Sequence, residues 1–359
     1  MTTRDYARPV GLFSRRRSPE NARRAQAEAI DDFWRWWQAD GATSTAKALA
    51  DHDPQRMVGP ITEHVHAIAA GLSWELAKGS DEHEHVLVVT SGGDPALRAA
   101  ARRWRLAAPP PDPTWEYDDA RRPAQDGFTL QLDGVGIDAA QAQVTARVEG
   151  PRVHVVVHHP ALERLPDTSR SSAAHLLLDA TLGERVVETW VGEISASHLP
   201  PLDPVALTGL GAVVDHLRGQ HLDRDGNPTW VLLQGQRRDG TPLLATAQVP
   251  LTAATAPHLD THVAVTVPYK DVTDAGFPGS GSLDELRRFE DHLTERLGGS
   301  GRLVAHETSG GVRLLHYYVD GATPAVAQLE AVARGWGQGR ARVDATDDPG
   351  WHAVRHLAT

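Results

Sequence analysis

The order of apolar runs in the C-terminal third constrains the fold of this chain more than any other feature. Alternating valines over 263–267 predict a strand, and a leucine stripe predicts a helix over 283–297. Two strand-like runs on either side of "TSGG" follow, then a helical pattern over 324–334 and a strand over 340–344. The order strand-helix-strand-strand-helix-strand predicts two split β-α-β units that share one sheet.

Local signals in this region agree with that order. Ser282 and Glu285 make the S-x-x-E pattern of a capping box, and Gly298 stands where a C-cap glycine is favoured. Gly310 and Gly311 separate two strand-like runs with almost no other residue between them. They therefore predict a hairpin turn with positive φ and need no ligand to explain them.

A further hairpin precedes this unit. Strands over 230–234 and 242–249 flank "RRDG", which is a direct hairpin signal. We therefore expect residues 225–359 to form a ferredoxin-like domain with an added N-terminal hairpin.

The preceding residues mix both kinds of element, so the fold class is expected to be α+β with two domains. Residues 1–24 are expected to be a basic disordered leader and residues 25–220 an α+β domain. Helices are expected from Pro19 (with Phe33, Trp36 and Trp37 as a core-facing ridge), from Pro54, and over "DPALRAAARRWR" and "SSAAHLLLDATLGE". Strands are expected over "HEHVLVVT", 114–118, 128–132, 144–148, 153–158 and "RVVETWVGEI".

The stretch "VVTSGGDP" (88–95) has the layout of an anion-binding loop, because a strand is followed by two glycines and a helix start. It lacks the Lys and Ser/Thr of a P-loop, and its glycines do not make G-x-G-x-x-G. Asp94 puts a carboxylate where a phosphate would bind. We expect a helix cap here, with an anion site as the alternative.

Composition excludes several classes of protein. The chain has no cysteine, so disulfides and thiolate chemistry are excluded, and no apolar stretch approaches a membrane span. The net charge is −11, made up of +5 over 1–24, −12 over 25–222 and −4 over 223–359. An acidic body repels nucleic-acid backbones, so nucleic acid is an expected partner only through the basic leader, if at all. A cytoplasmic location is expected.

The C-terminal region resembles a known family. "TWVLLQGQRRDGTPLLATAQVPL", "GFPGSGSLDELRRFEDHLTERL" and "HETSGGVRLLHYYVDG" resemble the bacterial family named domain of unknown function 695. That family is similar to the ribonuclease E inhibitor B proteins, which share a late acidic "DP-x-W" signature, here Asp348-Pro349-Gly350-Trp351. The resemblance implies a ferredoxin-like fold and a protein-binding, non-catalytic role.

The N-terminal region resembles another, uncharacterised bacterial family. The stretches that carry the resemblance include "FWRWWQ", "GLSWELAKG" and "HVLVVTSGGDPALRAAARRW". No chemistry is implied by it, so no catalytic residue is transferred.

One pattern points to an enzyme. His83 and His85 share one face of a predicted strand, as do His154 and His158. Four imidazoles could bind a metal if the two strands were neighbours, which would suit a metal-dependent hydrolase. Accidental pairs are common among 19 histidines, so we expect no metal, no cofactor and no catalytic residue.

The remaining unusual residues are aromatic. The candidates for binding a partner are Tyr317, Trp336, Asp348 and Trp351, because Trp and Tyr contribute strongly to interface hot spots. For the motif itself we expect Trp351 to be mostly buried, against helix 283–297 or helix 324–334, and Asp347 or Asp348 to cap a turn. The alternative is that Trp351 is an interface anchor. We expect a cytoplasmic, non-catalytic binding or regulatory protein that modulates a protein partner such as a nuclease or toxin.

Overall fold

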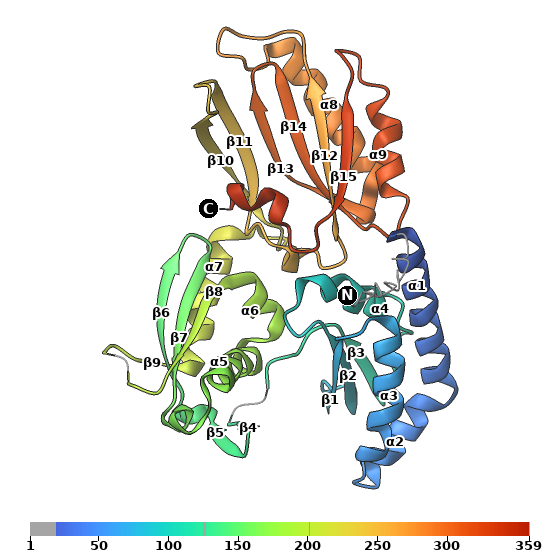
Figure 1. The fold of residues 1–359 in the computed structure, drawn as a ribbon, viewed down its shortest axis with the longest axis vertical. Coiled ribbons are helices and arrows are strands. Elements are labelled where there is room, and N and C mark those ends of the chain that lie inside the picture. Colours follow the sequence, from blue (N-terminus) through green and yellow to red (C-terminus); the bar gives the residue numbers. More distant parts are fainter. Residues whose placement is uncertain (1–18, 125–126, 201, 359) are drawn as a thin grey trace, which may run out of the picture.

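The computed structural model describes residues 19–124, 127–200 and 202–358. Figure 1 shows a C-terminal body above two smaller bodies, one N-terminal and one formed by the middle of the chain. The first helix begins at Pro19, so residues 19–24 of the predicted disordered leader are helical, and residues 1–18 lie outside the described residues. The α+β fold class is confirmed.

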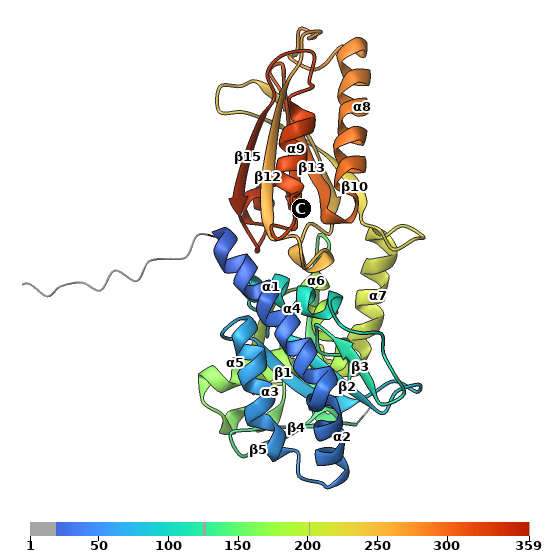
Figure 2. The same ribbon diagram turned by 90° about the vertical axis from the view of Figure 1, so that its right-hand side faces the viewer.

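The N-terminal body packs helices on a three-stranded sheet. Its elements are α1 (Pro19–Trp36), η1 (Trp37–Gly41), α2 (Ala42–Ala50), α3 (Gln55–Ile68), β1 (Ser73–Lys78), β2 (His85–Thr90), α4 (Pro95–Leu106) and β3 (Trp115–Asp118). β2 pairs antiparallel with β1 and parallel with β3. Figure 2 shows α1 running from the lower end of the C-terminal body along the N-terminal body.

Aromatic side chains fill this core. Phe33 and Trp37 are fully buried, as the ridge prediction requires, whereas Trp36 is half-buried and stacks on His64 with ring centroids 4.1 Å apart. Asp94 accepts a hydrogen bond from the Ala96 backbone N–H at 2.9 Å. It is therefore the N-cap of α4, as expected from "SGGDP".

The middle body has a four-stranded sheet in the order β8-β7-β6-β9 and a separate hairpin, β4-β5. Its elements are β4 (Thr129–Leu132), β5 (Val135–Asp138), η2 (Ala139–Gln141), β6 (Gln143–Glu149), β7 (Arg152–His158), η3 (Pro160–Arg164), α5 (Asp167–Leu182), α6 (Glu184–Trp190), β8 (Val191–Ser197), β9 (Val205–Ala206), η4 (Leu207–Gly209) and α7 (Leu210–His221).

The prediction of one strand over "RVVETWVGEI" is wrong for its first half, which is α6. The β-branched pair Val186-Val187 indicated a strand. Three of its four buried residues, however, recur at helical spacing: Glu184, Val187 and Trp190, with Thr189 as the fourth. Tertiary burial on one helix face outweighs the local strand propensity here.

The middle and N-terminal bodies have separate apolar cores. Together they cover the single domain expected over 25–220, and the domain boundaries stay a prediction. No helix in the described ranges has the length and apolar character to cross a bilayer.

The C-terminal body is built on a six-stranded sheet in the order β10-β11-β13-β14-β12-β15. Its elements are β10 (Thr229–Gln236), β11 (Pro242–Val249), η5 (Ala253–Thr255), β12 (Thr261–Pro268), α8 (Ser280–Leu297), η6 (Gly298–Ser300), β13 (Gly301–Ser309), β14 (Val312–Val319), α9 (Ala325–Ala333), β15 (Arg342–Asp347) and η7 (His352–Leu357). The order β13-β14-β12-β15 is that of the ferredoxin-like plan, and the β10-β11 hairpin extends it at one edge.

The two faces of this sheet are covered differently. α8 and α9 pack on one face with Val263, Leu315 and Tyr317 (Figures 1 and 2). The opposite face holds a smaller core around Tyr318, which the C-terminal segment with η7 covers.

Two predicted turn features have different outcomes. Gly310 and Gly311 form the hairpin turn between β13 and β14 with φ of 57° and 79°, as predicted. The capping box of Ser282 and Glu285 is not formed, because α8 already begins at Ser280. The Ser282 hydroxyl instead accepts from the Asp271 backbone N–H at 3.0 Å and donates to Gln338 at 2.6 Å.

Candidate functional site

The "DDPGW" motif starts η7. Asp348 accepts hydrogen bonds from the Tyr318 hydroxyl at 2.6 Å and from the backbone N–H groups of His352 at 2.9 Å and Ala353 at 2.8 Å. Burial alone would raise the pKa of Asp348, but these three donors hold that pKa below its ordinary value. The carboxylate is therefore a cap, as one of the two readings of the motif expected.

Trp351 lies on the face of the sheet that the helices do not cover. It is 3% exposed, stacks on Tyr318 with ring centroids 4.3 Å apart, and donates its indole N–H to the Leu259 carbonyl at 2.9 Å. Burial of Trp351 is as predicted, but packing against α8 or α9 is wrong. Tyr318 alternates with Tyr317 along β14, so its ring points away from those helices.

The glycine of this motif is not the residue that turns the chain. A Cβ on Gly350 would lie 2.2 Å from the His352 ring, whereas the left-handed residue of the turn is Trp351, with φ of 55°. Gly350 is not among the left-handed glycines, so the turn does not depend on its backbone freedom. The first atoms that a Cβ would meet belong to the exposed side chain of His352, which has room to move.

Tyr317 and Trp336 are on the helix-covered face. Tyr317 has no exposed surface, and Trp336 is 8% exposed and donates its indole N–H to the Pro268 carbonyl at 2.6 Å. With Asp348 and Trp351, this places all four partner-binding candidates in the interior. None of the four presents its side chain to a partner in this conformation.

A chain of hydrogen-bonded side chains lies beside Tyr318. His262 contacts His316, His316 contacts Glu307, and Glu307 contacts His356, each through atoms 3.0 Å apart. Hydrogen bonding from His316 lowers the pKa of Glu307 to about 2, and burial lowers the pKa of His262 to about 4. His262 and His316 are 9% and 4% exposed. These hydrogen bonds therefore hold η7 on the sheet through His356, and His262 and His316 are buried beneath it.

The four histidines considered for a metal lie apart. His85 begins β2 in the sheet of the N-terminal body, and His83 precedes that strand, whereas His154 and His158 lie on β7 in the middle body. The two strands are thus not neighbours. Within the described residues, no group of three or more His, Cys, Asp or Glu side chains is arranged to hold a metal ion.

A cleft of about 870 Å³ separates the N-terminal sheet from α5. The two arginines in its lining already have partners, since Arg121 pairs with Glu75 at 3.2 Å and Arg122 pairs with Glu116 at 2.7 Å. Burial and the nearby Glu184 raise the pKa of Asp179, which lies 3.5 Å from Arg121, to about 7. The walls of the cleft are mostly apolar, and its two arginines are paired with carboxylates.

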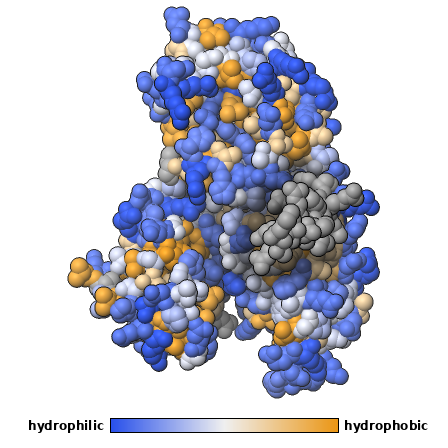
Figure 3. Space-filling view, viewed as in Figure 1, coloured by the Kyte–Doolittle hydropathy of each residue, from blue (hydrophilic) through white to orange (hydrophobic). Residues whose placement is uncertain are grey.

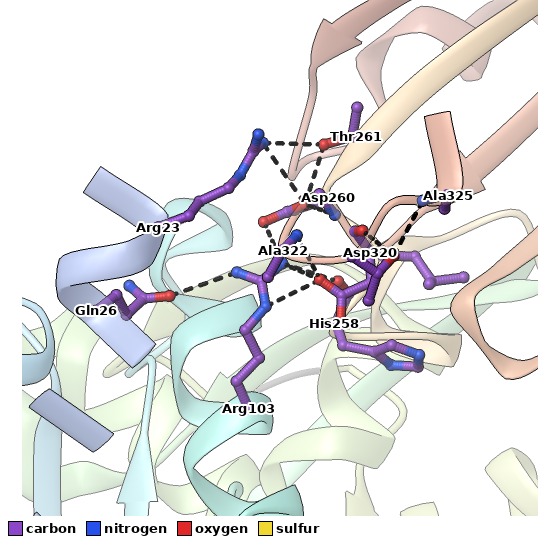
Figure 4. Close-up of polar contacts among 12 residues, drawn as sticks. Arg23, Gln26, Arg103, His258, Asp260, Thr261, Asp320, Ala322 and Ala325 are labelled. Carbon is purple, nitrogen blue, oxygen red and sulfur yellow. Dashed lines mark hydrogen bonds and ion pairs between the residues drawn. The ribbon is translucent and has the colours of Figure 1, made fainter. Parts of the chain in front are cut away.

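A partly buried ion-pair network joins the N-terminal helices to the C-terminal body (Figure 4). Arg103 on α4 contacts Asp320 at 2.6 Å and Asp260 at 2.8 Å, and the three side chains are 12–14% exposed. Burial alone would lower the pKa of Arg103, but the two aspartates raise it. Arg23 on α1 adds an ion pair to Asp347 at the end of β15. These contacts fasten the β12 and β15 side of the sheet.

The opposite edge of the sheet, β10, is open. No described strand pairs with its outer side. Trp230 is 45% exposed and Leu232 is 61% exposed, and no residue of "TWVLLQGQ" carries a charge. Trp230 also forms one wall of a pocket of about 360 Å³ beside the end of α8. By contrast, hydrophilic residues cover most of the face of the molecule in Figure 3.

The outer side of β10 offers backbone groups as well. The Arg237 N–H donates to the Thr241 carbonyl, which closes the hairpin to β11. Antiparallel pairing alternates along a strand, so the N–H and C=O groups of every second residue before Arg237 point away from β11. These are the residues Trp230, Leu232, Gln234 and Gln236. The sequence predicted that this strand belongs to an added hairpin at an edge of the sheet. It did not predict that Trp230 and Leu232 would be exposed.

Comparison with known proteins identifies only part of the chain. Residues 236–356 match the family model described as a family of unknown function, DUF695. This supports the resemblance found in the C-terminal region, and the match begins where β10 ends. No curated protein and no solved structure matches the chain. The similarity to ribonuclease E inhibitor B proteins and the N-terminal family stay predictions.

Proposed function

We propose that the chain is a cytoplasmic, non-catalytic binding protein that captures an extended segment of a basic partner protein at β10. The observation that carries the proposal is the open, uncharged edge of β10 with Trp230 and Leu232 exposed on it. An extended peptide added to such an edge gains main-chain hydrogen bonds, and its alternate side chains find pockets.

The geometry suits a peptide with apolar residues at every second position. The outward backbone groups of Trp230 and Leu232 would pair with such a peptide while their side chains contact its apolar residues. The pocket of about 360 Å³ next to Trp230 is large enough for one peptide side chain. Trp is among the residues that anchor interfaces most strongly.

Charge favours a basic partner over a second copy of this chain. The net charge of −11 makes two copies repel, whereas it attracts a positively charged protein and speeds their encounter. Nucleic-acid enzymes are basic, so a nuclease or a nucleic-acid-directed toxin is the class of partner that fits. The segment captured would be a strand at an edge of that partner or an extended tail.

The proposal can be tested with a displayed library of random peptides. The whole chain should enrich peptides that alternate apolar residues and carry Lys or Arg. The variants Trp230→Ser and Leu232→Lys should each weaken the best peptide roughly tenfold or more, the loss of a 1.4 kcal/mol contact. N-methylation of alternate peptide residues should abolish binding.

Val272 provides a matched control, because it is 44% exposed and lies away from β10. Val272→Ser should bind the selected peptides as the natural chain does. Peptides that bind all these variants equally, or concentration-dependent dimers without peptide enrichment, would contradict capture at β10.

A further inference from the structure

Arg302, at the start of β13, is a half-buried cation without a counter-ion among the described residues. Its Nη1 atom is inaccessible and has no hydrogen-bond partner, and no ion pair joins Arg302 to any described residue. Burial lowers the pKa of Arg302 and no carboxylate offsets this effect. Arg313 on the neighbouring strand behaves in the usual way, since it contacts Glu290 at 2.7 Å.

Arg302 borders a pocket of about 240 Å³ between the middle and C-terminal bodies. Arg185 from α6 and Arg218 from α7 also line it, and none of the described lining residues is Asp or Glu. Arg185 and Arg218 have acidic partners outside the pocket, Asp119 at 2.6 Å and Asp215 at 3.6 Å. Of the three arginines that line the pocket, Arg302 is therefore the one without an acidic partner among the described residues.

A guanidinium nitrogen that is buried without a hydrogen-bond partner is costly, so such groups are normally paired. We propose that this pocket is an oxyanion site in which Arg302 holds the phosphate or carboxylate group of a small ligand. The planar guanidinium is suited to two parallel hydrogen bonds with either group. Arg185 and Arg218 add positive potential around the anion.

The rest of the pocket suits the carbon body of a small ligand. Trp190 and Leu222 form apolar parts of the wall, and Thr189 and Asn227 supply neutral polar groups. The volume of about 240 Å³ restricts the ligand to a small organic acid or phosphate ester. Because the wall comes from α6, α7 and the C-terminal body, a bound anion would hold these elements together.

The site can be tested by thermal unfolding of the full chain. Sodium phosphate or sodium acetate is titrated at constant ionic strength, balanced with sodium chloride. At least one anion should raise the Tm in a saturable way, as ligands that bind only the folded state do. Arg302→Gln should weaken that response roughly tenfold or more, the loss of charge-assisted hydrogen bonds. The anion that responds identifies the group held.

Two controls separate this site from general effects. Arg152→Gln removes a different half-buried arginine, on β7, and should leave the anion response intact. Arg302 also lines the pocket beside Trp230, so the control on β10 is Leu232, which lines neither pocket. Leu232→Lys should leave the anion response intact, so this proposal and peptide capture can fail separately. Without either anion, Arg302→Gln should unfold at the same or a higher temperature, because it removes an uncompensated charge. An unchanged response in Arg302→Gln, or no response of the natural chain to either anion, would overturn the site.

Discussion

The two edges of the six-stranded sheet differ in chemistry and in attachment. β15 carries Arg342, Asp344 and Asp347, and Arg23 of the first helix pairs with Asp347. β10 carries no charge and exposes Trp230 and Leu232, and no described strand covers it. Charged residues on an edge prevent pairing with other strands, and β15 has this protection while β10 lacks it.

We infer from this difference that the β15 side of the domain serves its stability and that the β10 edge serves binding. Residues near β15, including the motif at Asp348 and Trp351, stabilise the body from inside. An unprotected apolar edge is a hazard for aggregation unless a partner covers it. Changes on the β15 side should therefore affect stability, and changes on β10 should affect binding.

The largest expected effect is that of Trp351→Ala. Truncating this aromatic, 3% exposed, should lower the free energy of unfolding by about 3–5 kcal/mol, the usual range for a buried Trp or Phe. Denaturant unfolding followed by circular dichroism measures it. If this variant keeps its stability but no longer binds the selected peptides, the β15 side is the binding surface and the roles assigned to the two edges are reversed.

The junction of the bodies gives the next effect. Arg103→Gln leaves Asp260 and Asp320 without their cation and should cost about 3 kcal/mol, as breaking buried ion pairs does. Arg105 is the control, because it lies on the same helix and Arg105→Gln should change stability by less than about 0.5 kcal/mol. Equal unfolding midpoints for the two variants would show that the ion pairs of Arg103 do not stabilise the β12 and β15 side of the sheet.

Acid should weaken the same body. Burial lowers the pKa of His262 and of His306 to about 4 from an ordinary 6.5. Their contribution is therefore present above pH 6.5 and is lost as the pH falls toward 4. Between pH 6.5 and 5 we expect a loss of about 1–2 kcal/mol for each histidine.

Urea unfolding at several pH values measures this loss. The double variant His262→Gln, His306→Gln should flatten the dependence, and His292→Gln, on the exposed side of α8, should not. A steep dependence that persists in the double variant would assign the acid sensitivity to other groups.

Sequence reasoning predicted the C-terminal fold well because its signals are local. Each strand and helix over 261–347 has its own period, and Gly310 and Gly311 mark a turn by their neighbours alone. The face of the sheet on which Trp351 packs was not predictable. The alternation of residues along a strand shows which side chains share a face, but not over which face the segment after β15 will cross. The Arg103 network was also missed, since its aspartates are 157 and 217 residues away.

The smallest effect on stability is expected at β10. Trp230→Ser and Leu232→Lys change side chains that are 45% and 61% exposed, so each should alter the free energy of unfolding by about 0.5 kcal/mol or less. Denaturant midpoints of the variants check this. A loss of several kcal/mol would make these residues part of the core and would undermine the contrast between the edges.

Amide hydrogen exchange with and without a saturating selected peptide tests capture at β10 most directly. The account predicts that the peptide slows exchange at the outward amides of Trp230, Leu232 and Gln234 and leaves β15 unchanged, because new main-chain hydrogen bonds form only at the open edge. Slowed exchange at β15 or η7, with β10 unaffected, would contradict it.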